Sequence, residues 1–391
     1  MINTLDDIIS AAETITGLIP QISDKTNFWM IRSKQGVFYN EYVAGEYIAI
    51  GWNSLTKAIL SDNNNDDNFY KQILKDNDYP DKMPGTALNK CRWFVDEIKS
   101  GDIAMIVGRS EIAFATIGDY FEDSTNSTTA EKELEIHAQI ETGTYIGLKC
   151  PYKKRRHISV ISTVDLGAAP PMVYKCLVSN RHSLSSLNEY ADAILSCCYD
   201  LSVYFNRLII KYHIRQPRDI NPFDFSLFTL SMADLISDNR CGLTGKYNLN
   251  SEGDVVFFLA NLGEDIGVFL KNNLVSVLLG YFILFGGKAA GIEFPSSIEK
   301  IKELVADLFY LKESKRIKIA EANKAEAEAV KAQIDATRSY YEIEELREKV
   351  QKKANQTVEN LTCAATPLNI KPPANNIIDI TALFQIDDET E

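Results

Sequence analysis

The sequence predicts an α+β protein in which a β-rich front part is followed by helices, the last of them long and charged. Short aromatic and β-branched runs separated by glycines, beginning with FWMIR at 28–32, are typical of strands. Residues 297–361 contain no proline or glycine and are dominated by alanine, glutamate and lysine, which predicts one long helix. The 391 residues suffice for two or three domains of roughly 150 residues each.

The front part is expected to mix helices with short strands. Apolar residues at helical spacing predict helices over 4–19, 68–77 and 86–100. Strands, indicated by aromatic and β-branched content, are expected over 28–32, 37–43, 46–52, 102–108, 111–121, 133–149 and 157–164. The pair 102–108 and 111–121 is predicted to form a hairpin around Arg109-Ser110.

The character of the sequence changes after Pro170-Pro171. Residues 172–178 and 185–213 are expected to be helical, and Pro217 and Pro222 predict a linker. We therefore expect five regions: a front domain at 1–170, a helical connector at 171–222, an apolar glycine-rich domain at 223–296, the long charged helix at 297–362 and a flexible acidic tail at 363–391.

The charge of the chain is −13, so no overall basic field attracts it to nucleic acid. The balance is uneven along the chain. Residues 101–150 carry 3 Lys or Arg against 9 Asp or Glu, whereas residues 151–220 carry 10 against 5. The basic run KKRR at 153–156 is expected either to follow a nucleic-acid backbone or to form a solvated turn that balances the acidic segment 119–141.

Several classes of protein are not expected from this sequence. Seven irregularly spaced cysteines without a C-x-x-C are typical of reduced thiols in the cytosol, and the start of the chain lacks the basic region of a signal peptide. We therefore expect a cytoplasmic protein. No H-E-x-x-H, G-x-S-x-G or phosphate-loop motif occurs, so neither a metal, a cofactor nor catalysis is expected, and a poorly marked nuclease core remains an alternative.

The order of elements over 28–165 carries a family resemblance. A helix through CRWF at 91–94 ends in the step Gly101-Asp102, a hairpin follows with a glycine-containing strand that leads to Tyr120, and a later strand starts with paired basic residues. This order resembles the EVE domain and its PUA-like relatives, including readers attached to modification-dependent restriction systems. The resemblance implies a PUA-like β-barrel with flanking helices, a pocket for a modified base, and a role in defence against phage.

The residues expected to bind a base or a phosphate lie in this same part of the chain. A base is held by stacking on flat side chains, and its edge and phosphate are held by polar and cationic groups. The candidates are Trp29, Arg32, Trp52, Trp93, Arg109, Ser110, Lys153, Lys154, Arg155 and Arg156. Core packing is the alternative role for each tryptophan.

The apolar stretch 266–287 allows two interpretations. Its uninterrupted part, Leu274 to Phe285, has 12 residues, fewer than the about 20 that span a membrane. A helix buried in the protein is the first interpretation, and contact with a membrane is the alternative.

The long charged helix at 297–362 is expected to mediate self-association. With Ile298 at position a of a heptad, seven of eight d positions are apolar, and Leu308 and Val350 are among them. A solitary helix held by Glu–Lys pairs is the alternative.

Together these features predict a non-catalytic binding protein. Its front domain is expected to recognise a nucleic acid or nucleotide, and its helices are expected to form a homo-oligomer or to act as an effector. The alternatives are a structural interaction protein and a membrane-active effector that uses residues 254–291.

Overall fold

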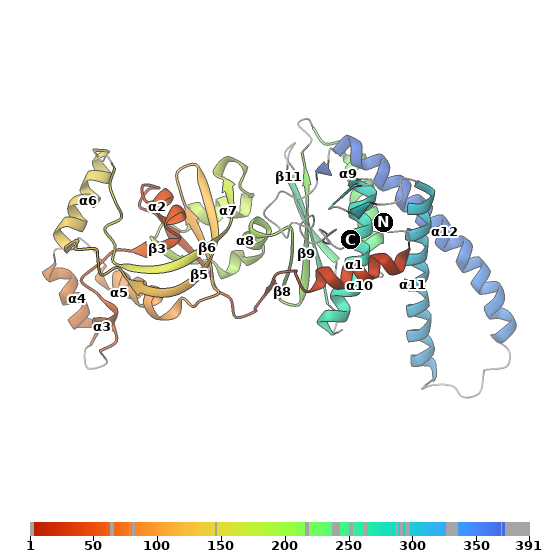
Figure 1. Cartoon of the computed structure of the whole chain (residues 1–391), viewed down its shortest axis with the longest axis horizontal. Helices are drawn as coiled ribbons and strands as arrows, with labels where there is room; N and C mark the ends of the chain where they lie inside the picture. The colour runs from red at the N-terminus through yellow and green to blue at the C-terminus, as the bar shows by residue number, and fades with distance from the viewer. Residues whose placement is uncertain are drawn as a thin grey trace, which may run out of the picture. The chain divides into compact units, whose positions relative to one another are not determined.

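The chain forms two compact units in the computed structural model (Figure 1). We name the units by their place in the sequence. The inner unit comprises residues 23–198, and the outer unit combines the flanking residues 1–22 and 199–391. The structure describes residues 4–62, 66–77, 79, 83–144, 147–215, 219–236, 243–249, 253–261, 265–285, 288–289, 292–293, 298–325, 335–368 and 370–371. This division differs from the expected one, because 171–198 belongs with the front domain and the first helix with the later part of the chain.

The inner unit is built on a curled six-stranded sheet with the order β3-β6-β5-β4-β2-β7. Only the pair β2–β4 is parallel, and the hairpin expected around Arg109-Ser110 is confirmed as β4–β5. Irregular register between β5 and β6 bends the two long strands, since bulges increase local twist (Figure 1). The strands are β2 Phe28–Arg32, β3 Tyr47–Ile50, β4 Ile103–Val107, β5 Glu111–Glu122, β6 Lys154–Asp165 and β7 Leu184–Ser186.

Helices surround this sheet, and two of them replace expected strands. The segment 37–43 contributes α2, and 133–149 contributes most of α6. In α6 the Thr129 side chain accepts a hydrogen bond from the Lys132 amide, and Gly143 ends the helix in a left-handed conformation. These caps, with glutamates in the first turn, outweigh the β-branched residues that suggested a strand. The helices are α2 Tyr39–Ala44, α3 Lys57–Leu60, α4 Asp67–Asp76, α5 Pro84–Arg92, a π-helical turn Trp93–Glu97, α6 Ala130–Thr142, α7 Pro171–Ser179 and α8 Ala191–Cys198.

A buried carboxylate joins the start of the sheet to the turn before β4. Asp102 accepts hydrogen bonds from the amides of Asn27 and Lys99 and from the indole Nε1 of Trp29, all at 2.9 Å. A buried charge is tolerated when several donors satisfy it. The Gly101-Asp102 step therefore fixes the parallel pairing of β2 with β4.

The outer unit contains the second sheet, with the order β1-β8-β9-β11-β10 and β14 also paired with β9. The predicted helix through 185–213 is confirmed only at α8. Its start belongs to β7 and a 3-10 turn, and 201–214 forms a hairpin whose turn residues Phe205 and Asn206 have positive φ. Such a turn matches the twist of two paired strands. The strands are β1 Gln21–Ile22, β8 Leu201–Tyr204, β9 Arg207–Ile214, β10 Leu243–Leu249, β11 Gly253–Ala260 and β14 Ile370–Lys371, and β12 Lys288–Ala289 pairs separately with β13 Ile292–Glu293.

Among its described residues, the outer unit also contains the helices α1 Leu5–Thr16, α9 Pro222–Ile236, α10 Ile266–Phe285, α11 Ile298–Ala325 and α12 Asp335–Leu368. The expectation of a buried helix in 266–287 is confirmed, since Leu270, Leu274 and Leu278 of α10 lie in the core. Among the helices in the described ranges, none has both the length and the apolarity needed to cross a bilayer.

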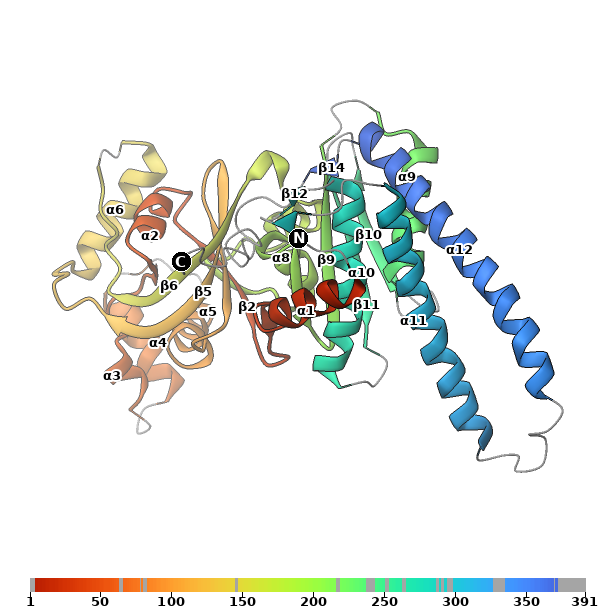
Figure 2. The same cartoon turned by 45° about the vertical axis from the view of Figure 1, so that its right-hand side comes forward.

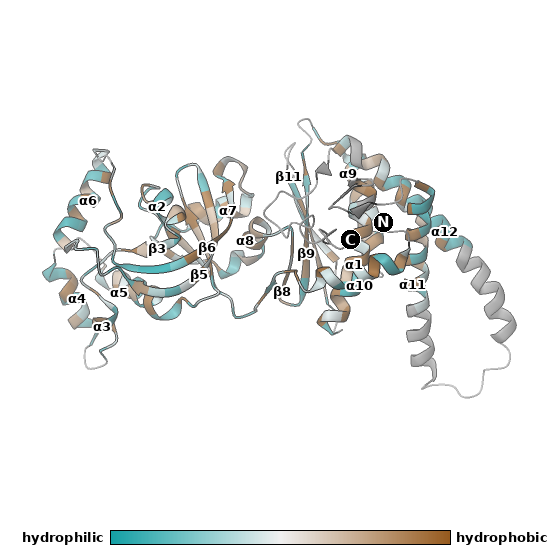
Figure 3. Cartoon of the chain, in the orientation of Figure 1, coloured by the Kyte–Doolittle hydropathy of each residue, from teal (hydrophilic) through white to brown (hydrophobic). Residues whose placement is uncertain are grey.

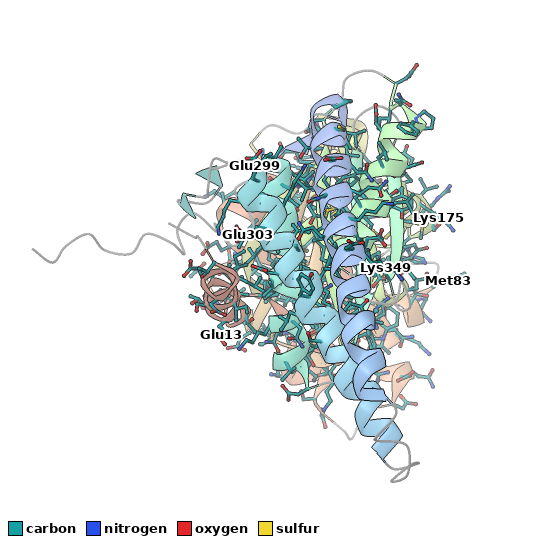
Figure 4. The ribbon with its side chains drawn as sticks, turned by 90° about the vertical axis from the view of Figure 1, so that its right-hand side faces the viewer. Glu13, Met83, Lys175, Glu299, Glu303 and Lys349 are labelled. Carbon is teal, nitrogen blue, oxygen red and sulfur yellow. The ribbon has the colours of Figure 1, made fainter. Side chains whose placement is uncertain are left out.

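The expected long helix at 297–362 is two helices rather than one. α11 and α12 lie side by side and antiparallel, because Lys302 near the start of α11 contacts Glu359 near the end of α12 at 2.7 Å (Figures 2 and 4). The heptad residues Leu308 and Val350 are buried in the core of the outer unit. The apolar seam is therefore used within the chain, in contacts between α11, α12 and α9.

Candidate functional site

The inner unit contains a pocket of about 620 Å³. The chain segments around it are the end of β2, the turn after β3, α6 and the loop before β7. Its lining combines aromatic, cationic and acidic side chains: Arg32, Lys34, Gln35, Ala49, Ile50, Gly51, Trp52, Tyr79, Lys90, Glu133, Leu134, His137, Ala138, Glu141, Tyr152, Arg181, His182 and Ser183. The volume lies within the range of about 300–1,000 Å³ that is usual for small-molecule sites.

Trp52 is the aromatic residue of the sequence prediction that lines this pocket. It is half-buried, and its φ of 59° is in the left-handed region, which is uncommon for a residue with a side chain. Its amide donates to Glu133 Oε1 at 2.9 Å, and its carbonyl accepts from Lys154 Nζ at 2.6 Å. Lys90 Nζ lies 5.7 Å from the indole ring centroid. Two charged side chains therefore hold a strained residue at the wall of the pocket, a pattern that is common at functional sites.

Glu133 positions this wall from α6. Its carboxylate is only 1% exposed. Oε1 accepts from the Trp52 amide, and Oε2 accepts from the Asn53 amide at 3.2 Å and the Tyr79 hydroxyl at 2.6 Å. A Cβ at Gly51 would come within 2.3 Å of Oε1, so a larger residue there would displace the carboxylate. Because both oxygens accept hydrogen bonds from residues of the wall, Glu133 orders the pocket.

His137 supplies a neutral hydrogen-bonding group one helical turn after Glu133. Burial lowers the pKa of His137 to about 4, with a further contribution from the charge of Lys34, so the ring is uncharged at neutral pH. Its Nε2 lies 2.8 Å from the Tyr152 hydroxyl, and burial raises the pKa of Tyr152 well above its usual value. Because a neutral phenol can donate or accept, this hydrogen bond joins two uncharged groups in either histidine tautomer.

Arg32 and Lys34 lie in the pocket wall but are already engaged. The Arg32 guanidinium donates to the carbonyls of Leu177 at 2.6 Å and Asn180 at 2.8 Å, which satisfies the C-terminal end of α7. Lys34 forms an ion pair with Glu141 at 3.3 Å. Lys34 and the following Gln35 have φ of 45° and 57°. This segment is a second strained part of the wall.

The loop before β7 contributes a cation and an unsatisfied hydroxyl. Arg181 and His182 are exposed, and the buried Ser183 Oγ has no hydrogen-bond partner within the described part of the chain. A buried polar atom without a partner costs about 1–3 kcal/mol.

The other two tryptophans lie in the hydrophobic interior. Trp29 is 5% exposed and donates its indole hydrogen to Asp102, and its ring centroid is 6.1 Å from that of Trp93. Trp93 is half-buried and packs against the core of the inner unit. Neither lines the pocket, and their contacts are those of the core-packing alternative.

Arg109 and Ser110 lie at the exposed turn between β4 and β5 and are not part of the pocket lining. Arg109 Nε donates to the carbonyl of Gln35 at 3.2 Å. Arg109 therefore contacts the strained segment that precedes the pocket wall.

Three residues of the basic run 153–156 form the start of β6, and two of these, Lys154 and Arg156, are buried. Arg156 is buried and donates to the carbonyls of Phe94 at 2.7 Å, Val95 at 3.0 Å and Gly118 at 3.2 Å. Arg155 pairs with Asp123 at 2.9 Å and lies 4.2 Å from the centroid of the Tyr47 ring. Lys154 is buried beneath Trp52, and Lys153 is half-buried. These contacts differ from both expected roles, because the run neither forms a turn nor presents a row of charges to solvent.

Of the lining residues, only Arg32 and Trp52 belong to the sequence prediction; the residues it missed include Tyr79, Lys90, Glu133, His137, Tyr152, Arg181 and Ser183. Three residues of α6 in the lining, Glu133, His137 and Glu141, are spaced by four. That spacing places side chains on one face of a helix, so a helix prediction for this segment would have grouped them.

Comparison of the chain with protein-family models, with curated proteins and with solved structures finds no match in any of the three. Among the described residues, no group of three or more His, Cys, Asp or Glu side chains is arranged to hold a metal ion.

Proposed function

We propose that the inner unit is a PUA- and EVE-like reader that binds a base, plain or modified, of a nucleic acid or nucleotide, and that the chain acts by binding rather than catalysis. The observation that carries this proposal is Trp52, a half-buried indole at the wall of a 620 Å³ pocket with cations beside it.

The lining suits a flat, polar ligand with a negative charge. An indole is a stacking surface for any base, since every base has a π-face. The imidazole of His137, uncharged at neutral pH, offers a neutral hydrogen-bonding group of the kind that pairs with a base edge. Lys90 and Arg181 supply positive charge for a phosphate.

The architecture supports the same proposal at a coarser level. The inner unit is a curled sheet flanked by helices, and its β4–β5 hairpin follows the Gly101-Asp102 step. This order of elements resembles that of the EVE family. A role in defence against phage follows from that resemblance by analogy. We further propose that the outer unit acts as the effector or self-associates.

The test is calorimetric titration of the full chain with modified and plain oligonucleotides and with nucleotides. Trp52→Ala is expected to weaken binding about 5- to 150-fold, because stacking contributes about 1–3 kcal/mol per base. Trp93→Phe, the matched control in the core, is expected to bind like the wild type. No binding to any base, or equal binding by Trp52→Ala, would refute the proposal.

A further inference from the structure

Building on the base-binding role proposed above, we infer that the ligand of the pocket is a free nucleotide rather than a base within a strand. Three observations on the inner unit support this choice: its charge, the contacts of its basic residues, and the size of the pocket.

The charge of the inner unit opposes a polyanion. Residues 23–198 contain 19 Lys and Arg against 23 Asp and Glu, a net charge of −4. Strand-binding proteins derive most of their affinity from rows of cations that displace counterions from successive phosphates. The inner unit has no such excess of positive charge.

The helix α6, which forms one wall of the pocket, carries a net negative charge. Residues 130–142 contain four glutamates and one lysine, and that Lys132 is paired with Glu135 at 2.6 Å. Glu131 and Glu135 are exposed, and their positions place them off the face that carries Glu133, His137 and Glu141 into the lining. Figure 3 shows both hydrophilic and hydrophobic residues on this helix. The helix therefore adds to the negative charge that a strand approaching the inner unit would meet.

The basic residues that a strand would need are engaged within the protein. Lys154 and Arg156 are buried with backbone carbonyl partners, and Arg155 is paired with Asp123. In the pocket itself, Arg32 caps α7 and Lys34 pairs with Glu141.

The cationic part of the lining fits one nucleotide. Arg181 is an exposed cation of the lining, which suits the one or two negative charges of a single phosphate. The pocket is also larger than a lone base requires, since about 620 Å³ lies in the range that encloses a whole small molecule. Base, sugar and phosphate can therefore enter together, with the base on Trp52 and the phosphate toward Arg181.

The experiment titrates the full chain by calorimetry with AMP, GMP, CMP and UMP, and with single strands made of the same bases. At least one nucleotide is expected to bind at least about tenfold more tightly than its strand. Its log Kd is expected to vary with log salt by a slope of about 1–2, not the 6 or more of a protein that neutralises many phosphates. A strand that binds more tightly, with a steep slope, would overturn this inference while base recognition stood. Failure of every nucleotide and every strand would overturn the proposed function as well.

A variant separates phosphate recognition from base recognition. Arg181→Gln is expected to weaken binding of the nucleotide at least about fivefold and to leave binding of its nucleoside unchanged, because only the nucleotide carries the phosphate. The control is Lys25→Gln, which removes an exposed charge just before the start of β2. The pocket-lining Arg32 lies at the opposite end of that strand, so Lys25→Gln should not change nucleotide binding. Unchanged nucleotide binding by Arg181→Gln would contradict the assigned position of the phosphate.

Discussion

At the scale of single residues, the pocket depends on charged side chains such as Glu133 and Lys154, whose hydrogen-bond partners cannot be identified from the sequence. Lys154, Arg155 and Arg156 follow one another along β6. Lys154 and Arg156 are buried, whereas Arg155 between them is only half-buried. A period of two marks a strand, but four consecutive charges hide it, because hydrophobicity does not alternate among them. Similarly, the three tryptophans were all identified from the sequence, whereas the left-handed backbone that places Trp52 at the pocket depends on Glu133, which is distant in sequence.

Glu133→Gln is predicted to destabilise the inner unit by about 1–3 kcal/mol, because an amide cannot accept all three hydrogen bonds that the carboxylate now accepts. All three tryptophans of the chain lie in the inner unit, so their fluorescence during urea unfolding reports this unit. Glu135→Gln, an exposed change on the same helix, should move the midpoint little. Equal midpoints for the two variants would show that Glu133 does not hold the wall.

At the scale of elements, the sequence predicts the β4–β5 hairpin, α4, α7 and the buried α10 correctly, because each has a strong local pattern. It fails at α6 and at the β8–β9 hairpin. The segment of α6 contains β-branched residues and follows a polar stretch, a pattern that suggested a strand. The capping residues Thr129 and Gly143 were the sequence signals that indicate a helix. The segment 201–214 is apolar almost throughout, and apolar runs of this kind do not distinguish a buried strand from a buried helix.

Thr129→Ala is predicted to destabilise α6 by about 1 kcal/mol, since the first turn loses the cap on the Lys132 amide. Because α6 carries Glu133 and His137 into the pocket, ligand binding should weaken in parallel. Hydrogen exchange of the α6 amides measures the effect, and faster exchange confined to residues 130–142 is expected. Ser127→Ala is the nearby control, and faster exchange in that variant as well would argue against a specific cap.

At the scale of the whole molecule, the boundary between the units could not be read from local patterns. Residues 21–22 pair in parallel with β8, whose paired residues Val203 and Tyr204 come 182 positions later in the sequence. The N-terminal helix α1 packs against α10 in the same unit. Periodicity shows which face of α1 is apolar but not which partner covers it, and the same limit applies to the seam of α11 and α12. Self-association through 297–362 remains a prediction that light scattering of the full chain can measure.

The outer unit has its own polar centre, a buried ion network around His213 that joins β8, β9 and β11. His213 Nδ1 lies 2.7 Å from Asp254, its Nε2 lies 3.1 Å from Asp200, and Lys211 contacts Asp200 at 2.8 Å. Arg215 also lies within 2.8 Å of the ring. Burial favours the neutral imidazole, but hydrogen bonds and charges from Asp200 and Asp254 outweigh burial and raise the pKa of His213 above its usual 6.5.

A raised pKa means that the folded unit binds the His213 proton more tightly than the unfolded chain does. The stabilisation is therefore complete below about pH 6.5 and is lost as pH rises through the folded pKa. Hydrogen exchange of β8 and β9, corrected for the intrinsic rate at each pH, should show lower protection above neutral pH in the wild type. His213→Gln should reduce protection at pH 6 and remove this pH dependence, whereas His182→Gln, an exposed histidine of the inner unit, should preserve it. Protection in the wild type that does not fall with rising pH would mean that the imidazolium does not join these strands.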